Sequence, residues 1–236
     1  MKKIAVIGSD GFVGSQISKQ IESSERFVLV PVTRGDNLKD AIEFADIIIH
    51  SANPAKRFFA ENNPEKDFHE TVEKTGIIKS LSRNKPLILI SSISARTQLD
   101  SVYGRNRRSC ELIADLDRSL VVRLGPMFGP GKSIGVLNDI INNRKVYAAA
   151  STEYAFVDVT YNAKKIVSLI SKYDTMQLVE IGARNGITLE SLRDKIKSTS
   201  TFEGRDDTQL PVSPPDDAPD VSKVIVFAKT MKTYGK

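Results

Sequence analysis

Short apolar runs alternate with amphipathic stretches over the first half of the chain. Runs such as residues 47–49 and 87–90 are rich in aliphatic and β-branched residues and too short for helices, as is typical of buried parallel strands. Between such runs, apolar residues recur at helical spacing, as at Val13, Ile17 and Ile21. The pattern predicts strands over 4–7, 27–32, 46–50, 86–90 and 120–124, and helices over 12–21, 38–44, 64–81 and 103–116.

Alternating strands and helices are typical of an α/β fold with a doubly wound, mostly parallel sheet of the Rossmann type. We therefore expect a Rossmann core over residues 1–125. The later, less regular part, residues 126–236, is expected to complete the sheet and form a small C-terminal substrate-binding lobe within one intertwined unit. In that part we predict helices over 136–141, 162–171, 189–196 and from 221, and a strand over 177–181.

Composition narrows the class of protein. The 236 residues are 40% hydrophobic and 27% charged, as in an ordinary globular domain, and no apolar run is long enough to cross a bilayer. The apolar N-terminal run ends at Gly8, too early for a signal peptide, so we expect a cytoplasmic protein with no membrane partner. With one cysteine, Cys110, and two histidines, we expect neither a disulfide framework nor a metal site.

The net charge of +5 and the isoelectric point near 9.2 raise the possibility of an anionic partner such as nucleic acid. However, the basic residues are spread along the chain and interleaved with acidic ones. Neither a clustered basic stripe nor an aromatic RNA-binding signature is present in the sequence. We therefore expect no nucleic-acid partner.

A glycine-rich turn joins the first predicted strand to the first predicted helix. Here Gly8 turns the chain, Gly11 lets the backbone approach a pyrophosphate, and Gly14 lets the helix pack close to the sheet. The helix N-terminus offers N–H groups and the positive end of its dipole to the phosphates. This arrangement predicts a dinucleotide site formed by Gly8, Ser9, Asp10, Gly11, Phe12, Val13 and Gly14.

The Gly-x-x-Gly-x-x-Gly spacing and later segments, taken in order, resemble the extended branch of the short-chain dehydrogenase/reductase superfamily, the NAD-dependent epimerase/dehydratase family. The chain is similar to an atypical, short member, and the resemblance extends from residue 1 to about 225. Four matching segments are a strand ending in His-Ser-Ala, a strand ending in Ser-Ser, a Tyr-x-x-x-Arg pair and a Gly-Pro-Gly loop, at residues 46–52, 89–92, 103–107 and 123–131. Two further segments, residues 156–159 and 220–223, also have counterparts in the family.

The resemblance implies a catalytic role for Tyr103, whose hydroxyl would exchange a proton with the substrate oxygen during hydride transfer. A free tyrosine, with a pKa of about 10, is a weak base, so a nearby cation must favour its phenolate. In the family that cation is a lysine one helical turn on, and here the position holds Arg107. Ser92 takes the role of the serine that binds the same oxygen, with Ser91 and Ser94 as alternatives.

Arginine in place of lysine leaves two hypotheses open. Arg107 keeps the positive charge, but its planar fork does not hold ribose hydroxyls as an ammonium does. The chain is therefore either an active enzyme with altered geometry or a catalytically weak NAD(P)-binding sensor or pseudo-enzyme on the same fold.

The residues at the end of the second strand indicate which cofactor is bound. Many NAD enzymes have an acidic residue there, which hydrogen-bonds to the ribose 2′-hydroxyl. Here Arg34 occupies that place and could pair with a 2′-phosphate, with Asp36 close behind, which favours NADP over NAD. The resemblance adds further cofactor-binding residues, namely Ser51, Ala52, Tyr103, Arg107 and Pro126.

The family mostly acts on nucleotide-activated sugars, so we expect such a substrate, with 4-keto reduction and epimerisation both open. Dehydration is disfavoured because Ile93 and Ser94 stand where dehydratases carry an Asp-Glu pair. A homodimer is possible by resemblance alone. The expected substrate-binding residues are Ser92, Ser94, Met127, Lys132 and Arg184.

Three further residues are expected to serve the structure. His50 ends the third strand and should hydrogen-bond there. Cys110 should be a small core residue. Arg123 lies within an apolar strand and should have an anionic or carbonyl partner.

Overall fold

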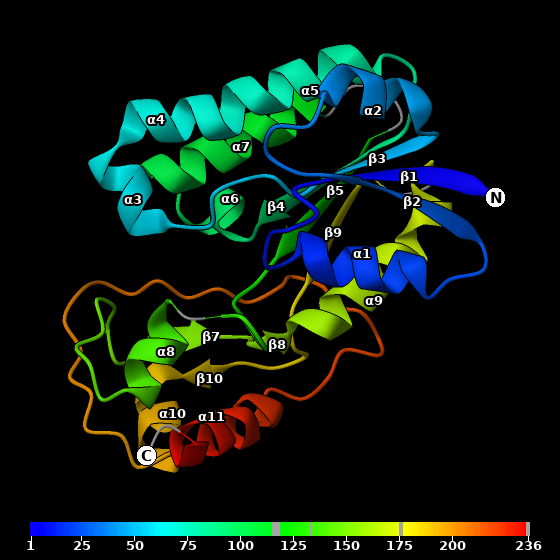
Figure 1. Ribbon diagram of the computed structural model, residues 1–236. Coiled ribbons are helices and arrows are strands. Elements are labelled where there is room, and N and C mark those ends of the chain that lie inside the picture. The colour runs from blue at the N-terminus through cyan, green and yellow to red at the C-terminus, as the bar shows by residue number, and fades with distance from the viewer. Residues whose placement is uncertain (115–118, 133, 175–176, 235–236) are drawn as a thin grey trace. The chain divides into compact units, whose positions relative to one another are not determined.

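The computed structural model describes residues 1–114, 119–132, 134–174 and 177–234 (Figure 1). The chain forms two compact units. The first contains Met1–Arg123 and Ala163–Val179, and the second contains Leu124–Asn162 and Glu180–Lys236. The boundary at residue 123 lies two positions before the one expected from the sequence, and the segment from residue 163 returns to the first unit.

A six-stranded sheet organises the first unit, in the order β2-β1-β3-β4-β5-β9. Strand β1 pairs in parallel with β2 on one side and β3 on the other, and β3 pairs in parallel with β4. The winding therefore reverses beside β1, and the predicted doubly wound α/β fold is confirmed. The strands are β1 (Lys2–Ile7), β2 (Phe27–Val32), β3 (Ile47–His50), β4 (Leu87–Ser92), β5 (Ser119–Leu124) and β9 (Leu178–Ile181).

Helices cover both faces of this sheet (Figure 1). On one face α2 (Leu38–Phe44), α5 (Lys74–Ser82) and α7 (Val102–Ala114) pack on the strands, and α1 (Gly14–Glu22) covers the other face. The apolar faces of β1, β3 and β4 meet those helices in a core that is closed to water. Fully buried members of this core include Ala5, Ile42, Ile48, Ile78, Leu87 and Leu89.

The helix predicted over residues 64–81 is wrong in one detail. It is divided into α4 (Pro64–Phe68), a π-helical turn η1 (His69–Glu73) and α5. A single widened turn shifts the helical periodicity by only one residue, so the hydrophobic pattern does not reveal it. Two short helices, α3 (Arg57–Asn62) and α6 (Ser94–Thr97), were not predicted, since each is too short to show a periodic apolar face.

The second unit packs helices against two small sheets. Helices α8 (Val136–Ile141), α10 (Leu189–Lys195) and α11 (Ser222–Tyr234) match their predictions within a residue or so. Helix α9 (Val159–Leu169), which continues as the 3-10 turn η2 (Ile170–Lys172), begins in this unit and ends in the first. The sheets join β10 (Ile187–Thr188) to β7 (Glu153–Tyr154), and β6 (Met127–Phe128) to β8 (Val157–Asp158). Strands of two residues leave no alternating pattern, so none of these was predicted.

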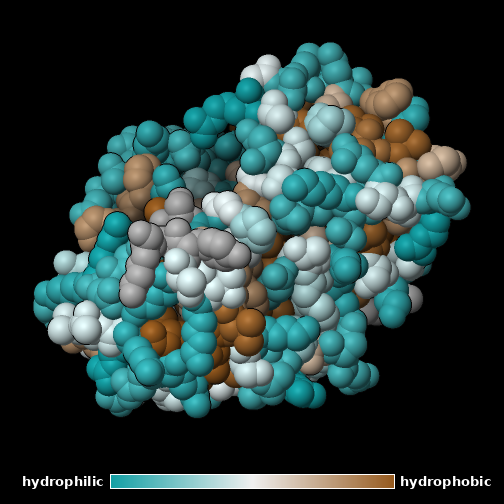
Figure 2. Space-filling model, turned by 60° about the horizontal axis from the view of Figure 1, so that its bottom comes forward, coloured by the Kyte–Doolittle hydropathy of each residue, from teal (hydrophilic) through white to brown (hydrophobic). Residues whose placement is uncertain are grey.

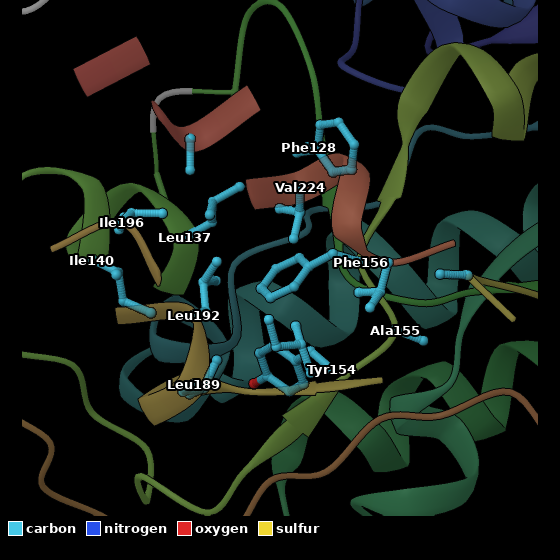
Figure 3. Packing of buried hydrophobic residues seen from close by; sticks show 14 of the residues in the cluster. Phe128, Leu137, Ile140, Tyr154, Ala155, Phe156, Leu189, Leu192, Ile196 and Val224 are labelled. Carbon is cyan, nitrogen blue, oxygen red and sulfur yellow. The ribbon is translucent and has the colours of Figure 1, made fainter. Parts of the chain in front are cut away.

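The core of the second unit is apolar and aromatic (Figure 3). Tyr154 and Phe156 meet edge to face with ring centroids 5.3 Å apart, and Phe128 lies 5.1 Å from Phe227. Leu189 and Leu192 of α10 and Val224 of α11 close the cluster. The second unit therefore has a hydrophobic core of its own.

Among the described helices, none is long and apolar enough to cross a bilayer. The face drawn in Figure 2 is mostly hydrophilic, and its hydrophobic residues occur in small groups.

Candidate functional site

The turn between β1 and α1 depends on two glycines. Gly8 has a φ of 84°, and a Cβ there would come within 2.8 Å of the backbone of Ala52. A Cβ on Gly14 would lie 1.9 Å from the carbonyl oxygen of Gly8. Ser51, after β3, also holds this turn, because its hydroxyl donates a hydrogen bond to the carbonyl oxygen of Ile7 at 2.9 Å. The turn and the segment after β3 are therefore in close contact, as the expected roles of Ser51 and Ala52 require.

The outer side of the turn is open. Gly11 is exposed, and a Cβ there would meet only the Gly8 carbonyl oxygen, at 3.2 Å. Val13, the N-cap of α1, has no side-chain acceptor to offer the first helical turn. Backbone N–H groups at a helix start bind anions, so these residues fit a pyrophosphate. Ser9 is buried within the turn, and Asp10 is exposed at its tip.

After β2, the carboxylate of Asp36 is engaged in a local turn. It accepts hydrogen bonds from the backbone N–H and the hydroxyl of Thr33, at 2.6 and 2.8 Å. These two bonds hold the pKa of Asp36 below its usual value, and the bond from the backbone N–H has the larger effect. Arg34 lies in the same turn and is exposed. Arg34 and Asp36 are therefore both exposed charges at this strand end, and the carboxylate of Asp36 is engaged with Thr33.

Helix α7, which carries Tyr103, packs against the segment after β4 that carries the serines. A Cβ on Gly104 would lie 2.0 Å from the Gln98 carbonyl oxygen and 2.8 Å from that of Ser94, so α6 rests directly on the start of α7. Ser92 is half-buried, and its hydroxyl accepts from the Ser94 N–H at 3.2 Å. The side chain of Tyr103, at the start of α7, is largely buried. The segment that follows the predicted serine thus contacts the start of the helix that carries the predicted tyrosine.

Arg107 lies one turn after Tyr103 and is buried with it. Its guanidinium carbon is 4.9 Å from the centroid of the Tyr103 ring, a cation–π contact. One terminal nitrogen donates to the carbonyl oxygen of Pro54, and only 4% of Arg107 is exposed. Arg107 is therefore a fixed cation against the face of the tyrosine ring.

The same helix is joined to the sheet by Glu111. This buried carboxylate accepts two hydrogen bonds from Arg123 of β5, at 2.8 and 2.7 Å. It also accepts from Ser91 at 2.6 Å and from Arg108 at 3.0 Å. The anionic partner expected for Arg123 is confirmed. Ser91 is engaged with this ion pair, which leaves Ser92 and Ser94 as candidates for the catalytic serine.

His50 and Cys110 lie in the interior. The Nε2 of His50 is 3.1 Å from the hydroxyl of Thr75, which itself donates to the Thr71 carbonyl, so Nε2 carries the proton. Burial, with Arg107 and Lys74 nearby, lowers the pKa of His50 to about 3. Burial raises the pKa of the Cys110 thiol. The predicted structural roles of both residues are confirmed: a neutral hydrogen-bonding histidine and a buried thiol.

The remaining predicted residues belong to the second unit. Pro126 accepts a hydrogen bond from Val157 at 3.1 Å, and Met127 begins β6. Lys132 lines a cavity of about 220 Å³ formed with residues of α8 and α11. Arg184 is exposed and pairs with Asp220 at 3.5 Å.

Four residues of this region were missed from the sequence: Asn53 and Pro54 after β3, and Gly104 and Glu111 on α7. The acceptor role of Pro54 belongs to its backbone and left no signal in the sequence. Both amide atoms of Asn53 are buried and lack a hydrogen-bond partner among the described residues. Gly104 could have been noticed beside the tyrosine, and Glu111 lies one turn after Arg107. In the described part of the chain, no group of three or more His, Cys, Asp or Glu side chains could hold a metal ion.

Comparison with known proteins gives one curated relative and many solved structures. No protein-family model matches the chain. A UDP-2-acetamido-2,6-beta-L-arabino-hexul-4-ose reductase of Pseudomonas aeruginosa is 29% identical over 119 residues, 46% of this chain and 30% of that protein. The chain thus matches less than a third of the relative's length.

Solved structures match over the whole chain. An NAD-dependent NDP-hexosamine 5,6-dehydratase involved in tunicamycin biosynthesis superimposes with a TM-score of 0.81 at 12% identity, covering 100% of this chain and 99% of that one. The chain shares the Rossmann-type α/β fold of this enzyme. The predicted resemblance is confirmed at this level.

Two further structures with this fold are similar. A UDP-N-acetylglucosamine 4-epimerase from Methanobrevibacter ruminantium has a TM-score of 0.78 at 14% identity and covers 99% of this chain and 98% of its own. RMD from Pseudomonas aeruginosa, complexed with NADPH, has a TM-score of 0.79 at 14% identity and covers 100% and 99%. At such identities the similarity concerns the fold.

Proposed function

We propose that this protein is an NADP(H)-dependent oxidoreductase that reduces the 4-keto group of a nucleotide-activated sugar. The observation that carries the proposal is the buried pair of Tyr103 and Arg107, 4.9 Å from ring centroid to guanidinium carbon, on a helix that packs against the segment carrying Ser94. The partial sequence match to a UDP-sugar reductase supports reduction over epimerisation. A cytoplasmic location and a homodimer stay predictions.

In this reaction Tyr103 acts as the proton donor. The substrate carbonyl oxygen accepts a hydrogen bond from Ser92 while the Tyr103 hydroxyl gives it a proton, and the carbonyl becomes an alcohol. Arg107 stabilises the phenolate that remains, because its charge is fixed against the ring and little water screens it. A solvent proton then restores the hydroxyl.

The residues of the first unit fit a dinucleotide. The turn from Gly8 to Gly14 would hold its pyrophosphate, and residues 51–52 would line the same place. When bound, the reduced nicotinamide supplies the hydride. Arg34 is proposed to pair with a 2′-phosphate, because it is an exposed cation in this turn and the carboxylate of Asp36 is already engaged with Thr33.

The proposal is tested by binding and turnover measured separately. NADPH, NADH and their oxidised forms are titrated by nicotinamide fluorescence, and 4-keto nucleotide sugars are assayed by loss of absorbance of the reduced cofactor. We expect tight NADPH binding, and turnover that Tyr103→Phe lowers about 100-fold or more while binding persists. Tyr173→Phe, also in the first unit, is the matched control and should change neither. Turnover that survives Tyr103→Phe would refute the role of Tyr103.

A second candidate function is dinucleotide binding without turnover. It is favoured by the anchoring of Arg107 to Pro54, because an arginine held in this way cannot follow the ribose as a lysine would. Binding of NADPH with no turnover on any keto sugar would select this function. Absence of all dinucleotide binding would exclude both.

A further inference from the structure

Two opposite charges are buried near the proposed site, and each is only partly satisfied. Arg107 is 4% exposed, and its Nε is buried with no hydrogen-bond partner among the described residues. Asp67 of α4 is 1% exposed, and its Oδ1 likewise has no partner there. A buried charge is strongly destabilising unless an opposite charge and hydrogen bonds compensate it. Each of these side chains therefore calls for a further partner.

Asp67 is hydrogen-bonded to helix α7 at the residue that precedes Arg107. The amide of Asn106 donates to Oδ2 of Asp67 at 2.8 Å, and Arg107 is the next residue. Cys110, one turn further, is buried, and burial is the main cause that raises the pKa of its thiol; Arg107 lowers that pKa, and Glu111 and Asp67 raise it. Glu111 is not available to Arg107, because Arg123, Arg108 and Ser91 already occupy its oxygens.

A third unsatisfied group lies between them in sequence. The hydroxyl of Thr71 is buried and has no hydrogen-bond partner in the described ranges. Thr71 follows Asp67 by four residues and lies in the π-helical turn η1, which contacts α7. Widened turns of this kind recur at functional sites in proteins.

We propose that Asp67 is the counter-charge of Arg107, coupled to it through a buried water molecule held by Asp67 Oδ1, Thr71 Oγ1 and Arg107 Nε. A buried water commonly has about three polar partners, and these atoms supply an acceptor, a hydroxyl and a donor. Asp67 is then a positioning residue, which fixes the cation that faces Tyr103. Its effect on turnover rests on the proposed function, whereas the pairing of charges does not.

A double-mutant cycle tests the pairing without cofactor. The variants Asp67→Asn, Arg107→Met and their combination are unfolded in urea. Asparagine keeps an acceptor for Asn106 and removes only the charge. We expect Asp67→Asn to lower the folding constant at least fivefold more in the wild type than in the Arg107→Met background, where no buried cation is left uncompensated. A smaller coupling overturns the pairing. Glu65→Gln, an exposed carboxylate on the same helix, should couple less than twofold.

Two further measurements keep the test decisive if a variant does not fold. A crystal structure of the wild-type protein at about 1.8 Å should contain a water within hydrogen-bond distance of all three atoms, and its absence overturns the proposal. In turnover, Asp67→Asn should lower kcat at least fivefold and change the Kd of NADPH less than twofold. An unchanged kcat overturns the positioning role, and loss of NADPH binding in the wild type would instead refute the proposed function.

Discussion

Arg123 donates two hydrogen bonds to the two carboxylate oxygens of Glu111, 2.8 Å from Nε and 2.7 Å from the terminal nitrogen. Both side chains are buried, and the fork geometry fixes their relative orientation. The pair joins β5 to α7, the helix that carries Tyr103 and Arg107. The position of the tyrosine thus depends on an ion pair two turns away.

Glu111→Gln should therefore destabilise the protein by roughly 3 kcal/mol, because Arg123 is left with an uncompensated charge in the interior. Urea unfolding of the two proteins measures this change. Arg108→Ala removes only the half-exposed partner of the same carboxylate and should cost less than about 1 kcal/mol. Equal losses of unfolding free energy from the two substitutions would show that the buried pair contributes no more to stability than the half-exposed one.

Arg107 should be replaceable by lysine only in part. Lysine keeps the charge that favours the phenolate but loses the planar contact with the Tyr103 ring and the reach to Pro54. We expect Arg107→Lys to retain turnover within about tenfold, and Arg107→Met to lose about 100-fold, with NADPH binding measured alongside. Equal turnover of the lysine and methionine variants would indicate that the charge has no role in the reaction.

The central strands β3 and β4 were predictable because each contains a short apolar run buried on both faces, at residues 47–49 and 87–90. The turn from Gly8 to Gly14 was predictable for a related reason. At two of its glycines a Cβ would collide with backbone atoms, so the sequence must carry glycine there.

The surroundings of Tyr103 were less accessible. The acceptor for Arg107 is a backbone carbonyl, that of Pro54, and backbone groups are present at every position. Asp67 lies in a stretch of polar residues, and only the fold shows that it faces inward. The role of a polar side chain can be inferred once its burial is known. The burial of Asp67, just before the π-helical turn, does not follow from helical periodicity.

Arg34 should contribute to the choice between NADPH and NADH. If its exposed guanidinium pairs with the 2′-phosphate, Arg34→Ala should weaken NADPH roughly tenfold to a hundredfold and leave NADH within twofold. Fluorescence titration of both cofactors measures the ratio. Arg26→Ala removes the same charge at the other end of β2 and is the control for general electrostatics. Equal weakening of both cofactors by Arg34→Ala would refute a specific phosphate contact.

Two glycines should respond to alanine in opposite ways. In Gly14→Ala the new Cβ would lie 1.9 Å from the Gly8 carbonyl oxygen, so we expect a loss of about 3 kcal/mol or more and no NADPH binding. Gly76 lies within α5, and a Cβ there meets nothing within 4 Å. Gly76→Ala should therefore stabilise the protein by about 0.5–1 kcal/mol. Thermal and urea unfolding distinguish the two, and a tolerated Gly14→Ala would contradict the close packing of the turn.

The two histidines should give the stability opposite dependences on pH. Burial, with Arg107 and Lys74 nearby, lowers the pKa of His50 to about 3, so below pH 6.5 the unfolded chain binds a proton that the folded chain does not. Its contribution is complete above pH 6.5 and is lost as the pH falls toward 3, by at most about 1.4 kcal/mol per pH unit.

His50→Gln keeps a donor for Thr75 and removes the titration, so its unfolding free energy should fall less steeply than that of the wild type between pH 6 and 4. Glu73, the nearest partner of the exposed His69, raises the pKa of that histidine, so its contribution is present at low pH and lost as the pH rises. His69→Gln should therefore leave the acid slope as steep as in the wild type, or steeper. All three proteins carry the same acidic groups, so the difference between the curves reports the histidine that was removed together with its coupling to its partners. An acid slope unchanged by His50→Gln would mean that His50 is charged in the folded protein, against its burial and its bond to Thr75.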